Sequence, residues 1–206
     1  MLFLLYLRGM HLFFSTPIWI NKIDDHEKIN QKLKKYIFQE KEKNPEGAKK
    51  SNVNGWHSEN FDLKDPGLSD FINEVSKYIG EAIKDMGWDL DTQLVKITSM
   101  WAIINNKNAF NEKHHHGNSA LSAAYYVKAE DNAGDIVFFD PRQANVFYHP
   151  SSKKANNINA QVQSVTPKPG TLVLFPSYLE HKVDPNLSSE ERIVISFNIS
   201  MIKKQI

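Results

Sequence analysis

Seven short segments between residues 94 and 201 are rich in β-branched and aromatic side chains, and no helical pattern interrupts them. Turn-forming clusters of Asn, Asp, Gly, Pro and Ser separate these segments. With a further short strand around the histidines at 114–116, they make about eight consecutive strands, which predicts an antiparallel sandwich or a small barrel. The seven segments are residues 94–104, 120–128, 135–139, 144–148, 160–165, 171–175 and 192–200.

The N-terminal part of the chain has a different pattern. Residues 12–20 read as a strand, and residues 24–42 carry apolar side chains at helical spacing among dense charge. A second helix begins at Asp65-Pro66, where an N-cap residue precedes proline in the first turn, and it ends at Gly87. We expect these helices to brace one outer face of the β core.

A chain of 206 residues is long enough to bury a core as one domain. We predict a single domain, residues 1–206, of the mainly β class with N-terminal helices (α+β). Residues 10–93 supply the N-terminal strand and about two α-helices, and residues 94–201 form the β core. Residues 1–9 are apolar but too few to span a bilayer, and Arg8 follows the apolar run. We interpret them as an upstream extension, with a short membrane-associating segment as the less favoured alternative.

The composition excludes several classes of function. The chain has no cysteine, which excludes disulfides, thiolate metal sites and cysteine nucleophiles, and leaves His, Asp and Glu to hold any metal. It also fits a reducing cytoplasm, the location we expect. The formal net charge is +1, so no overall field recruits nucleic acid or a membrane surface. The sequence contains neither a glycine-rich phosphate loop nor a G-x-S-x-G element.

The run His114-His115-His116 carries the strongest chemical signal. Side chains alternate along an extended chain, so His114 and His116 would point to one side and His115 away. His181 could complete a three-point face on the same metal if the sheet curls, as a jelly roll does. Such a face leaves positions open for a co-substrate and oxygen, as a non-haem iron oxygenase requires. The alternative is a solvated histidine loop that takes up metal adventitiously.

Arg192 opens the last apolar strand, and Ser196 follows four residues later on the same face. An arginine that points into a barrel is a buried charge that needs a partner, and its guanidinium matches a carboxylate of a dicarboxylate co-substrate. Tyr126, or less favourably Tyr125, could add a hydroxyl donor. The alternative is that Arg192 pairs in solvent with one of the two glutamates that precede it.

These residues resemble those of the Fe(II)/2-oxoglutarate-dependent dioxygenases, and the pattern is similar to an uncharacterised bacterial and marine-phage branch related to prolyl hydroxylases. The resemblance rests on NEKHHHGNSALSAAYYV, GDIVFFDPR, KPGTLVLFPSYLEHKVDPN and EERIVISFNI, and the segments LFFSTPIW and GWHS extend it over nearly the whole chain. It implies a double-stranded β-helix, a cupin-like jelly-roll barrel. It also implies a hydroxylase that binds Fe(II) and decarboxylates 2-oxoglutarate to succinate with molecular oxygen.

By that resemblance, His114 and His181 are iron ligands. Arg192 binds the distal carboxylate of 2-oxoglutarate, and Tyr126 and Ser196 assist it. One position departs from the wider family, in which a histidine is followed two residues later by aspartate or glutamate; here that residue is His116.

Three neutral imidazoles would leave a ferrous site with a charge of about +2, where a carboxylate would leave about +1. Asp135 is the rival third ligand. Two other functions therefore stay open. One is a three-histidine, cupin-like metal oxygenase that does not use 2-oxoglutarate, and the other is a non-catalytic barrel that serves as a binding module.

The sequence leaves the primary substrate open between a small molecule and a peptidyl side chain. Aromatic and basic residues that could line its approach are Trp56, Trp101, Phe139 and Arg142. Neither nucleic acid nor a membrane is expected as a partner, and edge strands would allow a homodimer.

Overall fold

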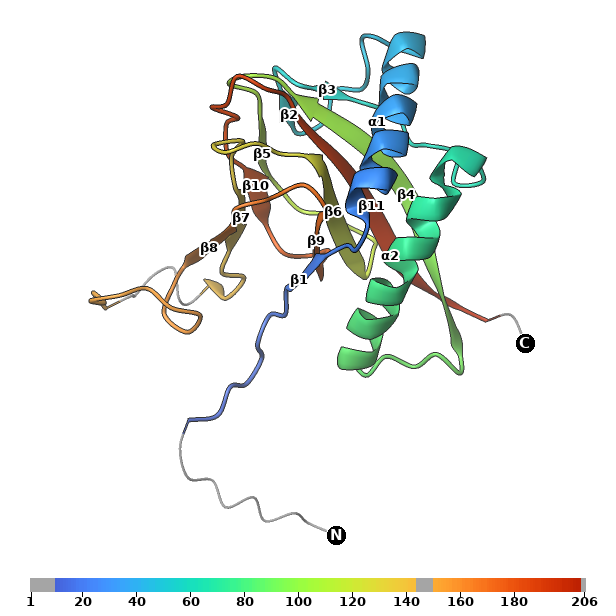
Figure 1. Cartoon of the computed structure of the whole chain (residues 1–206). Coiled ribbons are helices and arrows are strands. Elements are labelled where there is room, and N and C mark those ends of the chain that lie inside the picture. The colour runs from blue at the N-terminus through green and yellow to red at the C-terminus, as the bar shows by residue number, and fades with distance from the viewer. Residues whose placement is uncertain (1–9, 144–149, 205–206) are drawn as a thin grey trace.

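The computed structural model describes residues 10–143 and 150–204 (Figure 1). The expectations for residues 1–9 and for a strand at 144–148 lie outside the described residues. The helices are α1 (His26–Lys43) and α2 (Pro66–Asp85). The strands are β1 (Trp19–Lys22), β2 (Asn52–Val53), β3 (Trp56–His57), β4 (Gln93–Asn105), β5 (Phe110–His114), β6 (Leu121–Lys128), β7 (Ile136–Phe139), β8 (Val162–Val165), β9 (Thr171–Pro176), β10 (His181–Val183) and β11 (Arg192–Lys203).

The strands form two antiparallel sheets. The larger sheet has the order β1-β9-β6-β11-β4-β3, and the smaller has the order β2-β5-β10-β7-β8. Strand β11 pairs with β4 along its whole length and with β6 on its other side, so it lies inside the larger sheet. This is the predicted mainly β arrangement with two helices.

Both helices cover the outer face of the larger sheet (Figure 1). Helix α2 begins where the Asp65 carboxylate accepts a hydrogen bond of 2.8 Å from the Gly67 amide, as expected for an N-cap before proline. Its apolar stripe packs against the sheet, and α1 adds Leu33 and Ile37 to the same core. The chain turns away at Gly87, whose φ of +63° suits glycine.

Alternation along β6 and β11 divides the buried side chains between two cores. Tyr125 and Ile195 face the helices, whereas Tyr126 and Val194 face the smaller sheet. The second core is also interrupted by a cavity that residues of both sheets line. The functional site is therefore built on the inner faces of the sheets, and the helices stabilise the opposite face.

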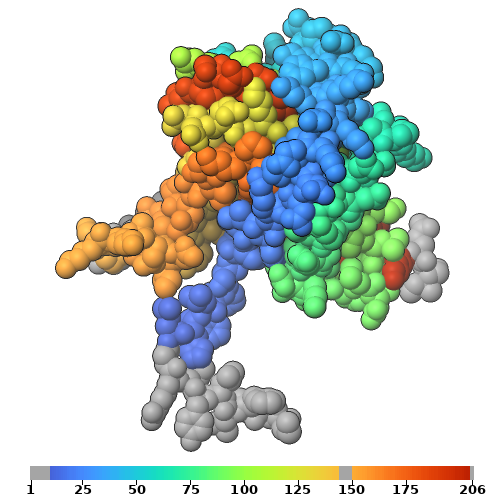
Figure 2. All heavy atoms as spheres, viewed as in Figure 1, coloured from blue at the N-terminus to red at the C-terminus, as the bar shows by residue number. Residues whose placement is uncertain are grey.

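The N-terminal strand is shorter than predicted. Strand β1 pairs with β9 only from Trp19 onward, and Pro17 just before it has no amide to donate to a ladder. Leu12, Phe13 and Phe14 are exposed, and this blue segment projects from the body of the molecule in Figure 2. Within the described residues, neither helix combines the length and apolarity that a bilayer crossing requires.

Candidate metal centre

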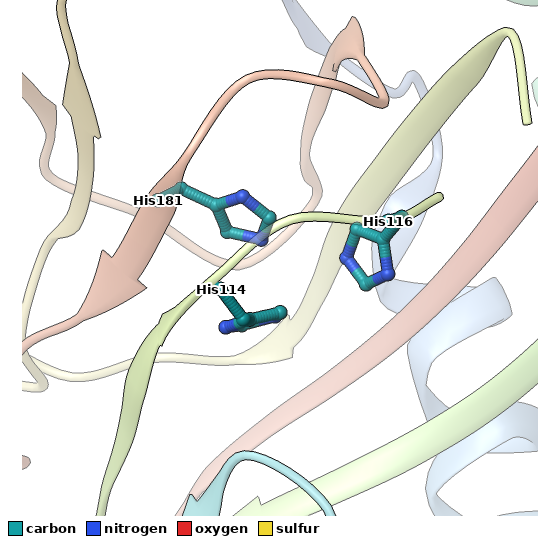
Figure 3. A group of neighbouring side chains, drawn as sticks. All are labelled: His114, His116 and His181. Carbon is teal, nitrogen blue, oxygen red and sulfur yellow. The ribbon is translucent and has the colours of Figure 1, made fainter. Parts of the chain in front are cut away.

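The structure brings His114, His116 and His181 together between the two sheets. His114 ends β5 and His181 begins β10, and the two are register partners. His116 lies beyond the end of β5, where its backbone amide donates to the Ser177 carbonyl at 2.9 Å. One ligand nitrogen from each of the three rings lies within 4.8 Å of the others, and Figure 3 shows the rings converging. The group could therefore hold one metal ion.

Two of these histidines have a fixed tautomer. Nδ1 of His114 donates to the Glu112 carbonyl at 2.6 Å, and Nδ1 of His181 donates to the Leu179 carbonyl at 3.0 Å. Because a carbonyl only accepts, the proton lies on Nδ1 and Nε2 presents its lone pair, as metal ligands need. His116 has ring contacts with Trp101 and His181 and, in the described part of the chain, no ring hydrogen bond.

Burial also keeps the three imidazole rings neutral, the state in which they can bind a cation. It lowers the pKa of His116 to about 4 and that of His181 to about 3, and the neighbouring histidines lower both further. Burial likewise lowers the pKa of His114. All three imidazoles are therefore neutral at pH 7, and metal binding there does not have to displace protons from them.

The group contains no carboxylate. Asp135, the rival ligand, is not part of it; its backbone carbonyl instead accepts a 2.9 Å hydrogen bond from the Asp184 amide. The donor set among the described residues is thus three imidazoles, a set that suits iron, zinc, copper or nickel. It fits a divalent iron, with the additional positive charge that the sequence predicts.

Arg192 lies in the wall of the same cavity and is 1 % exposed. Its Nη1 donates to the carbonyls of Ala133, Gly134 (3.2 Å) and Asp184 (3.1 Å), whereas Nη2 is buried and has no partner in the described residues. Gly134 has a φ of +88°, and a Cβ there would lie 2.7 Å from Nη1. This carbonyl cradle therefore requires glycine at 134, and it leaves Nη2 for a ligand.

The alternative pairing of Arg192 with the preceding glutamates is absent from the structure. Lys128 binds both of them, at 2.7 Å from Glu190 and 3.2 Å from Glu191. Arg192 is instead a buried guanidinium without a carboxylate partner among the described residues. Such a charge is costly unless a ligand pairs with it.

Ser196 and Tyr126 line the same cavity as Arg192. Burial raises the pKa of Tyr126 to about 12, so its hydroxyl keeps its proton at neutral pH and can donate. Tyr125 points the other way and donates to Asn30 Oδ1 at 2.6 Å. The structure thus brings together Arg192, Ser196 and the tyrosine that the sequence analysis favoured.

The cavity has a volume of about 460 Å³ and is lined by residues of both sheets. Trp101 lines it, as expected, whereas Trp56 lies in the helix-side core and donates to the Asn44 carbonyl. Phe139 and Arg142 line a separate groove next to the N-terminal segment.

Several polar residues of the cavity were missed by the sequence analysis, among them His57, Asn105 and Asn111. The Asn105 amide donates to Asn111 Oδ1 at 3.1 Å, and Asn111 donates to Ser51 Oγ at 3.2 Å. A signal was available only for Asn105, which lies four residues after Trp101 on the same strand and therefore on the same face.

A jelly-roll pair of sheets with three converging histidines and an arginine whose Nη2 is unpaired in the described residues is an arrangement typical of metal-dependent oxygenases. Residues 99–198, just under half of the chain, match the family model described as "Putative 2OG-Fe(II) oxygenase", which supports membership of the 2-oxoglutarate–Fe(II) oxygenase family. Its enzyme class is accordingly an oxidoreductase of the dioxygenase type. No curated protein matched the chain.

Solved structures show the same fold. A prolyl-4-hydroxylase from Pseudomonas putida is 12% identical with a TM-score of 0.64, over 93% of this chain and 95% of that one. HygX from Streptomyces hygroscopicus, solved with nickel, 2-oxoglutarate and hygromycin B, is 9% identical with a TM-score of 0.62, over 90% and 83%. A Trichoplax adhaerens prolyl hydroxylase in complex with a hypoxia-inducible-factor peptide is 13% identical with a TM-score of 0.61, over 92% and 84%. At these identities the likeness shows the fold, which is the predicted jelly roll.

Proposed function

We propose that the protein is an Fe(II)- and 2-oxoglutarate-dependent dioxygenase that hydroxylates an organic substrate while 2-oxoglutarate is decarboxylated to succinate. His114, His116 and His181 would hold the iron. Arg192, assisted by Ser196 and Tyr126, would bind the distal carboxylate of the co-substrate. When bound, iron and 2-oxoglutarate together supply the oxidant that is made from dioxygen, and the protein supplies orientation and a dry cavity.

The unpartnered Nη2 of Arg192 carries this proposal. Arg192 lies in the wall of the cavity that also contains the three histidines, and a buried guanidinium without an anion beside it is costly. Among the described residues, those that line the cavity include no Asp or Glu. A ligand would supply that anion, and a carboxylate matches the geometry of a guanidinium.

Tyr126 and Ser196 add neutral donors to that anion site. The two hydroxyls would satisfy lone pairs of a carboxylate that the single free nitrogen of Arg192 leaves unpaired. The three neutral imidazoles leave the full charge of the metal for the other end of the co-substrate. A dianion with a carboxylate at each end fits this arrangement of charge.

A three-histidine metal oxygenase that does not use 2-oxoglutarate is the second candidate. The observation that favours it is the absence of a carboxylate from the metal group. Arg192→Ala separates the two candidates, because it should abolish a response to 2-oxoglutarate in the first and leave turnover unchanged in the second.

The test is to load the purified protein with Fe(II) without oxygen, add 2-oxoglutarate, and record the visible spectrum. A metal-to-ligand charge-transfer band, followed by succinate once air is admitted, is the expected result. Iron that binds without band or succinate would favour the second candidate. A protein that binds no iron would be a non-catalytic binding module.

A further inference from the structure

We infer that the primary substrate presents an amide group to a subsite formed by Trp101 and His57, beside His116. The inference rests on the proposed function, since it concerns the substrate of that same cavity. Both residues line the cavity and each is 8 % exposed. Neither is used by the proposed metal or by the proposed co-substrate site.

Trp101 supplies an unused hydrogen-bond donor. It lies on β4 opposite Ser196, and its ring centroid is 5.6 Å from that of His116. Its indole Nε1 is buried and has no acceptor in the described part of the chain. A buried tryptophan N–H normally finds a partner, so an acceptor atom of a ligand would suit this one.

His57 supplies an acceptor next to that donor. Its ring stacks on Trp101 at 5.8 Å between centroids and 12° between planes. Nδ1 lies 2.6 Å from the Ser58 carbonyl, to which it must donate, so Nε2 carries the lone pair. Burial first, and then the charge of Lys50, lower the pKa of His57 and keep the ring neutral.

Strand β3, which carries His57, and the loop that follows it are fixed to β4. The Ser58 amide donates to the Ala102 carbonyl at 2.9 Å, and the Ala102 amide donates to Ser58 Oγ at 2.9 Å. Further along, the Phe61 amide donates to the Met100 carbonyl at 2.8 Å. The donor and the acceptor are therefore held in a constant relation, as a specific binding site requires.

An adjacent donor and acceptor match an amide. Its carbonyl accepts from Trp101, and its N–H donates to His57. A carboxylate offers only acceptors and would face the lone pair of His57, whereas an ammonium offers only donors and would face the indole N–H. Because His116 adjoins Trp101, a group bound here would lie beside the metal group.

The other orphaned acceptor of the cavity wall does not compete with this subsite. Asn105 Oδ1 is pressed against Gly55, where a Cβ would lie 2.2 Å away. Asn105 is also the register partner of Arg192 on β11, and its amide group is already bonded to Asn111.

The test uses ligand-detected NMR on the full chain loaded with Zn(II), a diamagnetic and redox-silent stand-in for iron, and saturated with 2-oxoglutarate. The probes are N-methylacetamide and two near-isosteres: methyl acetate, which lacks the N–H, and propionate, which is anionic. We expect the amide to bind at least about fivefold tighter than either. Equal or tighter binding of the ester or of propionate would overturn the inference.

Two variants locate the binding. Trp101→Phe removes the N–H, and His57→Asn keeps a donor for Ser58 but, with its shorter side chain, has no acceptor at the position of Nε2. Each variant should bind the amide about 2- to 10-fold more weakly than the wild type. An unchanged affinity in both would contradict the assignment. Trp88→Phe, at a partly buried position of the helix-side core, is the matched control and should bind the amide normally.

The same samples report the affinity for 2-oxoglutarate. A variant that retains it has a folded cavity, which excludes loss of structure as the cause of weak amide binding. A wild-type protein that fails to bind 2-oxoglutarate would contradict the proposed function, while the amide titration would still test the subsite. A blocked tripeptide and a primary carboxamide, compared as further probes, distinguish a peptide from a small molecule as the source; preference for either supports an amide.

Discussion

The two faces of the six-stranded sheet carry opposite chemistry on the same strands. Along β11, Ile193, Ile195 and Phe197 face the helices and are fully buried among apolar side chains, whereas Arg192 and Ser196 face the cavity. Burial of apolar surface on the first face stabilises the folded protein. The second contains a charge and polar groups whose burial opposes folding until a ligand pairs with them. Stability and binding should therefore be separable by mutation.

The largest expected effect is on binding alone. His181→Ala removes one of three ligand nitrogens and should reduce iron affinity by more than the about 10- to 100-fold that the loss of a supporting hydrogen bond costs. Turnover should be lost, while the free energy of unfolding of the metal-free protein should hardly change. Metal content after loading and a denaturant titration measure both. Full activity in this variant would contradict the proposed site.

Phe197→Ala tests the opposite face. Its side chain is fully buried and packs edge-on against Phe71 of α2 at 6.0 Å between centroids. The cavity left behind should lower the free energy of unfolding by about 3–5 kcal/mol. Iron affinity of the fraction that remains folded should be unchanged. A loss of iron affinity at least as large as that of His181→Ala would show that the two faces are not independent.

Gly134→Ala should affect the cavity through the cradle of Arg192. A Cβ there meets Nη1 at 2.7 Å and the Asp184 carbonyl at 2.3 Å, at a φ of +88° that disfavours any side chain. We expect the dissociation constant of 2-oxoglutarate to rise about tenfold, which corresponds to about 1.4 kcal/mol, with iron affinity retained. Gly80→Ala is the control, because nothing lies within 4 Å of its Cβ position on α2. It should stabilise the helix by about 0.5–1 kcal/mol.

The sequence predicts the parts of this design that depend on periodicity. The alternation along β11 indicates that Arg192 and Ser196 share a face, and the stripe of α2 indicates a helix on one side of the sheet. His57 could not be assigned, because β3 has only two residues and so shows no period. The cradle of Arg192 could not be predicted either, since it is made of backbone carbonyls, which no side-chain pattern encodes.

Low pH should destabilise the cavity face in particular. The pKa values of His116 and His181 are about 4 and 3 in the folded protein, against about 6.5 in an unfolded chain. Between pH 6.5 and 4, the unfolded chain binds protons that the folded state does not, so stability falls as the pH falls through this range. Thermal unfolding of the metal-free protein from pH 7.5 to 4.5 should show the decline, and His181→Ala should make it shallower. An identical slope in the variant would contradict the assignment.

The smallest expected effect comes from substitution of His116, which lacks the ring hydrogen bond that fixes the tautomer of the other two proposed ligands among the described residues. Its ring is held only by ring contacts in the described residues, so His116→Asp should retain iron, whereas His181→Ala should not. The added carboxylate reduces the charge of the ferrous site by one. This change should lower the reduction potential of the iron and reduce the affinity for 2-oxoglutarate by a few-fold. Redox titration and the charge-transfer band measure the two effects. An unchanged potential would mean that His116 is not a ligand, and the metal group would then consist of His114 and His181 with solvent in the third position.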